Sequence, residues 1–206
     1  MKGKLEKKLD AEVSNYLDRL ESLYEVKCLT TGKIDSDTYV RFLKTFYIIE
    51  MISQKAVTLA SKKTKGINEY LSKRFLLCAK GEFGHAEIAL EDLKEMGQEH
   101  LYINEVESAE VYNDFLQRTA DEFPLGILGH SYLFENASGI LFPKNEKLGY
   151  PSKFIEVHAK EDPGHSLAIK RTVRNIEEDL SDQEIGRIIS LSRQSGEHLM
   201  ELFNNV

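Results

Sequence analysis

Apolar residues recur at helical spacing along almost the whole chain, and this pattern constrains the fold more than any other feature. Between residues 3 and 29 they fall three or four positions apart, which is typical of an amphipathic helix. We find no pair of segments that alternates as two neighbouring strands would. The pattern predicts an all-α fold, with further helices at about 36–57 and beyond, 68–97, 104–121, 125–136, around residue 158, and 181–203.

Capping residues mark several of the expected helix ends. Thr31-Gly32 is expected to end the first helix, Ser36-Asp37 to cap the second, and Asn68 to cap the third. Pro124 suits a first helical turn. The sequence from Ser181 to Glu184 is a Ser-x-x-Glu capping box, so we expect the last helix to begin there.

The totals predict one soluble domain that spans residues 1–206. The chain has 41% hydrophobic residues, and its net charge of -7 comes from 34 acidic and 27 basic residues. This acidic balance disfavours nucleic acid as a partner. No apolar run approaches the ~20 residues that cross a bilayer, and the charged N-terminus lacks the apolar core of a signal peptide. We therefore expect a cytoplasmic protein without a membrane partner.

A short segment near residue 160 contains His158, Asp162 and His165 in the spacing His-x3-Asp-x2-His. At about 100° per residue on a helix, these three residues lie within roughly 60° of one another. Two imidazoles and a carboxylate on one stripe form half of a metal site, and such mixed ligands suit iron or manganese. Pro163 either kinks this helix or begins a new one that Asp162 caps.

Two earlier segments contain residues that could complete the site. Glu82 and His85 form a Glu-x-x-His pair, expected on one helix face, and Glu135 is a single acid in a run that otherwise reads as buried. Inward-facing carboxylates and Glu-x-x-His pairs build helical di-iron sites. A buried unpaired carboxylate is costly, so we expect Glu135 to point at the histidines of the later segment. Spacing alone leaves open both a metal site and a set of buried His–carboxylate hydrogen bonds.

In this order, the motifs Glu-x2-His, Tyr-x2-Glu at Tyr132, and His-x3-Asp-x2-His resemble those of the haem-oxygenase-like di-iron oxidases and oxygenases. This family is also called the iron-containing redox enzymes, and its superfamily includes thiaminase II and the pyrroloquinoline quinone synthase. The resemblance covers roughly residues 36–180, and His-x3-Asp-x2-His is its specific part. It implies a single-domain haem-oxygenase-like bundle of about seven helices.

The resemblance also implies a set of ligands for two iron ions, with manganese as an alternative. Carried over by motif, the ligands are Glu82, His85, Glu135, His158, Asp162 and His165. Some family members place the first carboxylate two turns before its histidine, where this chain has Cys78. Glu82 is therefore assigned, with Glu87 as the alternative. Haem is disfavoured, because haem oxygenase needs a histidine on its first helix and no histidine precedes His85.

The activity that the resemblance implies is oxidation of a small organic substrate with O2 as co-substrate, by C–C cleavage, desaturation or N-oxygenation. Electrons would come from the substrate or from an external reductant, since the chain has no flavin or iron–sulfur motif. Two alternatives are a cofactorless enzyme like thiaminase II or the pyrroloquinoline quinone synthase, and a non-catalytic regulatory or interaction protein. Neither Cys28 nor Cys78 matches the motif of the thiaminase II nucleophile. A homodimer is left open.

Other residues are expected to surround the ligands. Candidates for direct contact with the ligand side chains are Glu156, Glu161, Tyr132 and His130. Glycines within helices ask for a packing reason, because each costs up to about 1 kcal/mol relative to alanine. We expect the helices to leave room for a substrate at Gly81, Gly84, Gly126 and Gly129.

Overall fold

Helices make up all the regular structure of the described residues, which in this computed structural model are 3–98, 106–142 and 149–206. In chain order they are α1 (Lys4–Leu20), α2 (Tyr24–Thr30), α3 (Ser36–Thr64), α4 (Glu69–Gly81), α5 (His85–Glu95), α6 (Glu107–Glu122), α7 (Ile127–Leu141), α8 (Lys153–Ile176) and α9 (Asp182–Asn205). Short 3₁₀ turns at Pro124–Gly126 and Glu177–Asp179 precede α7 and α9. The all-α prediction is confirmed.

Most of the predicted capping residues act as expected. The Asn68 side chain accepts a hydrogen bond from the Leu71 amide, and Ser181 forms the complete capping box with Glu184. Pro124 begins a 3₁₀ turn directly before α7. The prediction for α3 was wrong by one residue, because the Asp35 carboxylate, one position before Ser36, accepts from the Thr38 amide.

Two predicted helices are each divided in two, so the described residues form nine α-helices instead of about seven. The first divides between α1 and α2, where the Ser22 hydroxyl donates to the Arg19 carbonyl and competes with helical bonding. The second divides between α4 and α5. Gly84 has φ 97°, a left-handed conformation that glycine adopts without steric cost and that ends a regular helix. The expectation that Glu82 and His85 share one helix face was therefore wrong.

α8 is continuous from Lys153 to Ile176, although Pro163 lies inside it. Of the two interpretations of Pro163, the new helix capped by Asp162 is excluded. A proline inside a helix removes one backbone hydrogen bond and crowds the preceding turn, which tertiary packing must offset. Here the uninterrupted helix keeps His158, Asp162 and His165 on one side, facing α7 and the α4–α5 junction.

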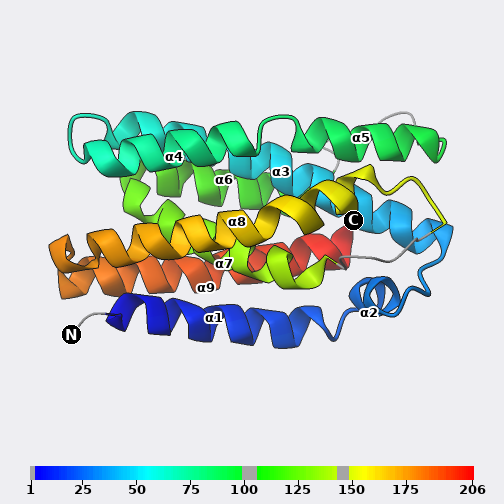
Figure 1. The fold of residues 1–206 in the computed structure, drawn as a ribbon, viewed down its shortest axis with the longest axis horizontal. Helices are drawn as coiled ribbons and strands as arrows, with labels where there is room; N and C mark the ends of the chain where they lie inside the picture. Colours follow the sequence, from blue (N-terminus) through cyan, green and yellow to red (C-terminus); the bar gives the residue numbers. More distant parts are fainter. Residues whose placement is uncertain (1–2, 99–105, 143–148) are drawn as a thin grey trace.

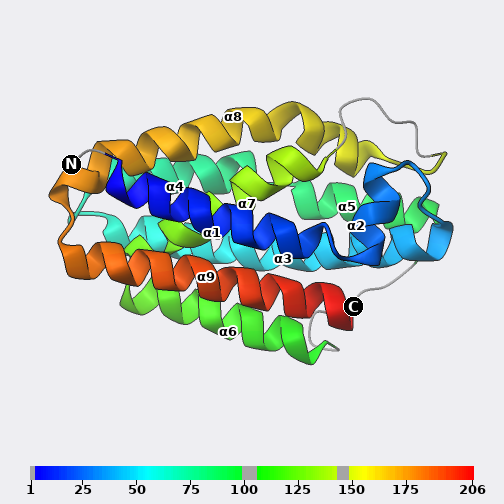
Figure 2. The ribbon, with the colours of Figure 1, turned by 90° about the horizontal axis from the view of Figure 1, so that it is seen from below.

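The helices lie roughly along one direction, with α4 and α5 following one another along one edge of the bundle (Figure 1). α3 packs against α4, α5 and α6, and α7 packs against α1, α8 and α9. The view in Figure 2 shows α8 and α9 on opposite sides of α7. One apolar cluster extends through residues of α1 to α9, so the bundle is a single domain. In the described ranges, no helix combines the length and apolarity needed to span a bilayer.

α7 and α9 approach closely at Gly129, which predicts a specific sensitivity. A Cβ at Gly129 would lie 2.5 Å from the Ile188 carbonyl oxygen, whereas a Cβ at Gly186 would meet no atom within 4 Å. Gly129→Ala should therefore lower the free energy of unfolding by about 1–3 kcal/mol. Gly186→Ala, at an exposed position of α9, should leave it unchanged or raise it by up to about 1 kcal/mol. Urea denaturation of both variants checks this, and equal effects would contradict the close approach.

Candidate metal centre

Three histidines and four carboxylates meet inside the bundle, at a point where five helices contribute. The structure brings together all six residues that the motifs selected and adds Glu50, which the sequence analysis missed. Glu50 comes from α3, Glu82 from the end of α4, His85 from the start of α5, Glu135 from α7, and His158, Asp162 and His165 from α8. Six of these residues are buried and His165 is partly exposed.

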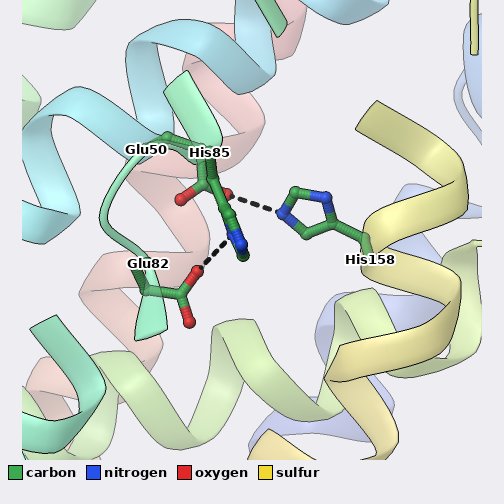
Figure 3. A group of neighbouring side chains, drawn as sticks. All are labelled: Glu50, Glu82, His85 and His158. Atoms are coloured by element: carbon green, nitrogen blue, oxygen red, sulfur yellow. Dashed lines mark ion pairs between the residues drawn. The ribbon is translucent and has the colours of Figure 1, made fainter. Parts of the chain in front are cut away.

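The inner group consists of Glu50, Glu82, His85 and His158, whose donor atoms all lie within 4.8 Å of one another. Figure 3 shows the four side chains converging from α3, the α4–α5 junction and α8. His158 Nε2 is 3.4 Å from Glu50 Oε1, and His85 Nδ1 is 2.8 Å from Glu82 Oε2. The break at Gly84 turns Glu82 and His85 toward each other, so the two reach the group from separate helices.

The outer group consists of Glu135, Asp162 and His165, again with donor atoms within 4.8 Å of one another. His165 Nδ1 is 3.4 Å from Glu135 Oε2 and 3.9 Å from Asp162 Oδ1. Glu82 connects the two groups, because its Oε1 is 3.0 Å from His165 Nδ1. The expectation that Glu135 is buried and points at the His158–His165 stripe is confirmed.

Cys78 lies beside the outer group. Its thiol is 3.7 Å from Glu135 Oε1, and its sulfur forms a third donor set with Glu82 and Glu135 within 4.8 Å. Burial raises the pKa of this thiol well above its usual value, and the charges of Glu135 and Glu82 raise it further. In the absence of a bound cation Cys78 is therefore a neutral thiol at the wall of the site.

The cluster contains an unusual concentration of buried polar atoms without hydrogen bonds. Within the described residues, such atoms include both oxygens of Glu50, Glu82 Oε1, His85 Nδ1, His158 Nε2, Asp162 Oδ2 and His165 Nδ1. The close N···O approaches in both groups bring unlike charges together, but at these atoms they lack hydrogen-bond geometry. Buried polar groups normally have partners, because an unsatisfied one costs about 1–3 kcal/mol.

Burial and neighbouring charges shift the pKa values of all four residues of the inner group. Burial raises the pKa of Glu50 well above its usual range and lowers the pKa of His158. Burial also raises the pKa of Glu82, but His165 and His85 outweigh it and lower that pKa to about 2. For His85, burial lowers the pKa, but Glu82 prevails and raises it to about 9. Without a cation, Glu50 is favoured as the neutral acid and Glu82 as the carboxylate.

In the outer group, the carboxylates of Glu135 and Glu82 raise the pKa of His165 to about 11. Burial raises the pKa of Glu135 to about 7 and that of Asp162 to about 6. A protonated side chain among these three must lose its proton before it can bind a cation. Occupancy of the site and proton release are therefore linked.

Glu50 was missed because it belongs to no spaced motif. Its only signal is a single acid inside the apolar run from Phe46 to Ile52, the same kind of signal that identified Glu135. Only the tertiary packing of α3 against α5 places it opposite His158. Glu87, the alternative to Glu82, is exposed on α5, and therefore Glu82 is the acid of that segment that reaches the cluster.

Of the candidates for contact with the ligand side chains, only Glu161 lies at the cluster, with its Oε2 3.6 Å from His85 Nε2. Tyr132 donates to Asp10, and exposed Glu156 accepts from Ser152. His130 bonds to Ser53, and its burial lowers its pKa to about 4. These three expectations were wrong, because the side chains face other helices or the surface.

A cavity of about 210 Å³ adjoins the outer group. Cys78, Glu82, Glu135 and His165 form one part of its wall, and side chains of α4, α7 and α8 form the rest. The expectation that Gly126 and Gly129 leave this room was wrong, because both lie against neighbouring helices. Gly81 does lie at the site, since a Cβ there would be 3.5 Å from the His165 ring.

The bundle has the haem-oxygenase-like fold, which several solved structures share. A TenA homologue from Pyrococcus furiosus superposes with a TM-score of 0.81 at 15% identity, covering 97% of this chain and 98% of that one. A Shewanella denitrificans domain of unknown function with a heme oxygenase-like fold gives 0.77 at 17%, covering 96% and 90%. Heme oxygenase from Leptospira interrogans gives 0.66 at 17%, covering 97% and 98%.

At these identities the likeness shows the fold alone. No protein-family model and no curated protein matches the sequence. The predicted haem-oxygenase-like fold is confirmed, and any activity has to be argued from the side chains of the cluster.

The burial of Glu50 predicts how its contribution to the stability of the metal-free protein depends on pH. Its pKa in the folded state lies well above the usual 4.5, so the folded state binds its proton more tightly than the unfolded state does. The contribution of Glu50 to the free energy of unfolding therefore falls as pH rises above about 4.5. Glu50→Gln removes this loss and should raise the free energy of unfolding at pH 8 by about 1–3 kcal/mol.

The measurement is urea denaturation with a chelator present, at pH 5 and pH 8. The gain from Glu50→Gln should be smaller at pH 5, where wild-type Glu50 is neutral. Glu197→Gln, at an exposed position of α9, is the matched control and should change little at either pH. A Glu50→Gln variant less stable than wild type at pH 8 would contradict the assignment of an uncompensated buried acid.

Proposed function

We propose that the cluster binds two metal ions, with iron preferred over manganese, and that the protein is an O2-dependent oxidase or oxygenase of a small organic molecule. The observation that supports this most directly is the set of buried donor atoms without hydrogen bonds. In an apolar core, hydrogen bonds alone leave these atoms unsatisfied, whereas cations would satisfy them. The donor set of three imidazoles and four carboxylates has the mixed character that suits iron or manganese.

The two groups divide the ligands between the two ions. The inner group would hold one ion through Glu50, Glu82, His85 and His158, and the outer group would hold the other through Glu135, Asp162 and His165. Glu82 is suited to serve both, because its two oxygens face histidines of different groups. Two bound iron ions would supply the activation of O2.

The chain itself orients the histidines. His158 Nδ1 donates to the Phe154 carbonyl at 2.7 Å, which leaves Nε2 without a proton and directed at Glu50. The Glu161 carboxylate lies beside His85 Nε2 and is placed to accept the proton of that nitrogen. His85 Nδ1 is then free to bind a cation. Such outer partners fix the ring orientation and raise the basicity of a ligand.

Apolar side chains cover His158 of the inner group. The rings of Phe142 and Phe154 lie against His158, with centroid distances of 5.1 and 4.0 Å. A dry environment strengthens electrostatic interactions within the site and suppresses side reactions. Electrons are not supplied by any flavin or iron–sulfur motif of the chain, so the substrate or an external reductant must provide them.

A second candidate is a cofactorless enzyme that uses Cys78 as a nucleophile. The observation in its favour is the thiol of Cys78 at the cavity wall, 3.7 Å from a Glu135 oxygen. An adjacent carboxylate can act as the base that activates a thiol. This candidate predicts no stoichiometric metal and complete loss of activity in Cys78→Ser, so metal analysis separates it from the di-iron proposal.

The first test is an anaerobic Fe(II) titration with metal analysis of the dialysed protein. Binding should saturate near two equivalents per chain, as in helical di-iron sites. Glu50→Gln should lose about one equivalent through the inner group, and Asp162→Asn about one through the outer group. His198→Gln on α9, outside both groups, should still bind two. Absence of saturable binding by the wild type would contradict the proposal.

The second test concerns O2. The Fe(II)-loaded protein should consume O2, and a cognate substrate should accelerate the reaction, because the reducing equivalents come from the substrate or an added reductant. Stopped-flow mixing with and without a panel of amino acids, fatty acids and aromatic amines checks this. The Zn(II)-loaded protein is the control and should be inert, since Zn(II) has no redox chemistry. A protein that binds two irons yet never consumes O2 would favour a regulatory or binding role.

A further inference from the structure

The cavity beside the outer group has a positively charged side chain, that of Arg74, at its far end. Its wall includes Arg74 and Cys78 of α4 and Glu82 directly after the helix, which lie at intervals of four residues. On α8 it includes His165 and, seven residues later, Thr172. Since a helix rises about 1.5 Å per residue, Arg74 stands about 12 Å along the helix from Glu82. The cavity therefore runs from the outer group to Arg74.

Arg74 has no carboxylate partner among the described residues. Its Nε donates to the Thr172 hydroxyl at 3.1 Å, and the side chain is half-buried. By contrast, Arg174 and Arg193 each form a two-point pair with a glutamate. The contact with Thr172 fixes one edge of the guanidinium and leaves its terminal nitrogens available to a ligand in the cavity.

The rest of the wall is mostly apolar, with Ser131 as its one polar residue. Its apolar residues are Phe75, Leu77, Leu128, Ala168 and Ile169. The volume of about 210 Å³ exceeds the cavity of about 150 Å³ that holds one benzene molecule. Such a space fits a small hydrocarbon chain or one aromatic ring, with a single charged group at the Arg74 end.

We propose that the cavity binds a small monocarboxylic acid, with its carboxylate on Arg74 and its apolar body against α4, α7 and α8. The planar guanidinium matches a carboxylate through two parallel hydrogen bonds. A second negative charge at the other end is disfavoured, because Glu82 and Glu135 lie there. The carboxylate is held away from the cluster, and the opposite end of the molecule is presented to the outer group.

The proposed orientation of the acid toward the outer group rests on the proposed function, but the binding of its carboxylate to Arg74 does not. The first experiment therefore uses metal-free protein, with octanoate and its uncharged analogue octanamide as probes in isothermal titration calorimetry. Octanoate should bind about tenfold or more tightly than octanamide, as expected for hydrogen bonds to charged groups. Arg74→Gln should abolish this preference and leave octanamide binding unchanged, which also shows that the cavity is intact.

Two controls accompany this experiment. Lys73→Gln removes the neighbouring, exposed positive charge of α4 and should leave octanoate affinity as in the wild type. Arg74→Lys keeps the positive charge but loses the planar guanidinium with its two parallel donors, and it should bind octanoate with intermediate affinity. No saturable binding of octanoate, equal affinity for octanoate and octanamide, or an unchanged octanoate affinity in Arg74→Gln would each overturn the proposal.

The orientation is tested with Mn(II)-loaded protein and the NMR spectrum of octanoate in exchange with it. Paramagnetic broadening should be stronger at the terminal methyl group than at the methylene next to the carboxylate. Stronger broadening at that methylene would overturn the orientation. Failure of Mn(II) to bind would count against the proposed function alone, because the calorimetric result with metal-free protein stands independently.

Discussion

The arrangement of this bundle depends on one costly feature, a cluster of seven ionisable side chains of which six are buried in the core. Taking a charge out of water costs several kcal/mol unless partners compensate it. The compensation within the described residues is incomplete, since Glu50, His158 and Asp162 retain buried atoms without hydrogen bonds. Such a cluster persists where a bound cation or a catalytic role offsets its cost, and perturbed pKa values of this kind gather at functional sites.

The helix architecture follows from this cluster. α8 continues through Pro163 and so presents His158, Asp162 and His165 together, and α4 ends at Gly81, directly before buried Glu82. The left-handed Gly84 then starts α5 with His85 already facing the core. The proline and the glycine, both unfavourable inside a regular helix, occur where the cluster requires them. Local departures from ideal helix chemistry are expected at functional sites.

Periodicity alone was sufficient to predict the helical class, because amphipathic helices leave a strong local signal. The helix breaks after Leu20 and Gly81 were not predicted. They depend on short polar or glycine segments, and the apolar periodicity on either side of these segments continues to predict a helix. Six residues of the cluster were selected by their motifs, and Glu50 was missed because it belongs to no motif and meets His158, 108 positions away, only through the packing of α3. The division into an inner and an outer group was also out of reach, because it depends on how α3, α7 and α8 pack.

The two groups differ in what surrounds them, and this difference indicates a direction of approach. The side chains of Glu50 and His158 are 1% and 2% exposed, and aromatic rings lie against His158. Of the inner group, Glu82 is the residue that lines the cavity. His165 is 26% exposed and lines the cavity together with Glu135. The inner group is therefore suited to hold an ion, whereas the outer group is suited both to hold one and to meet a second molecule. Glu82, which contacts histidines of both groups, is the side chain through which an event at the outer group would alter the charge balance of the inner one.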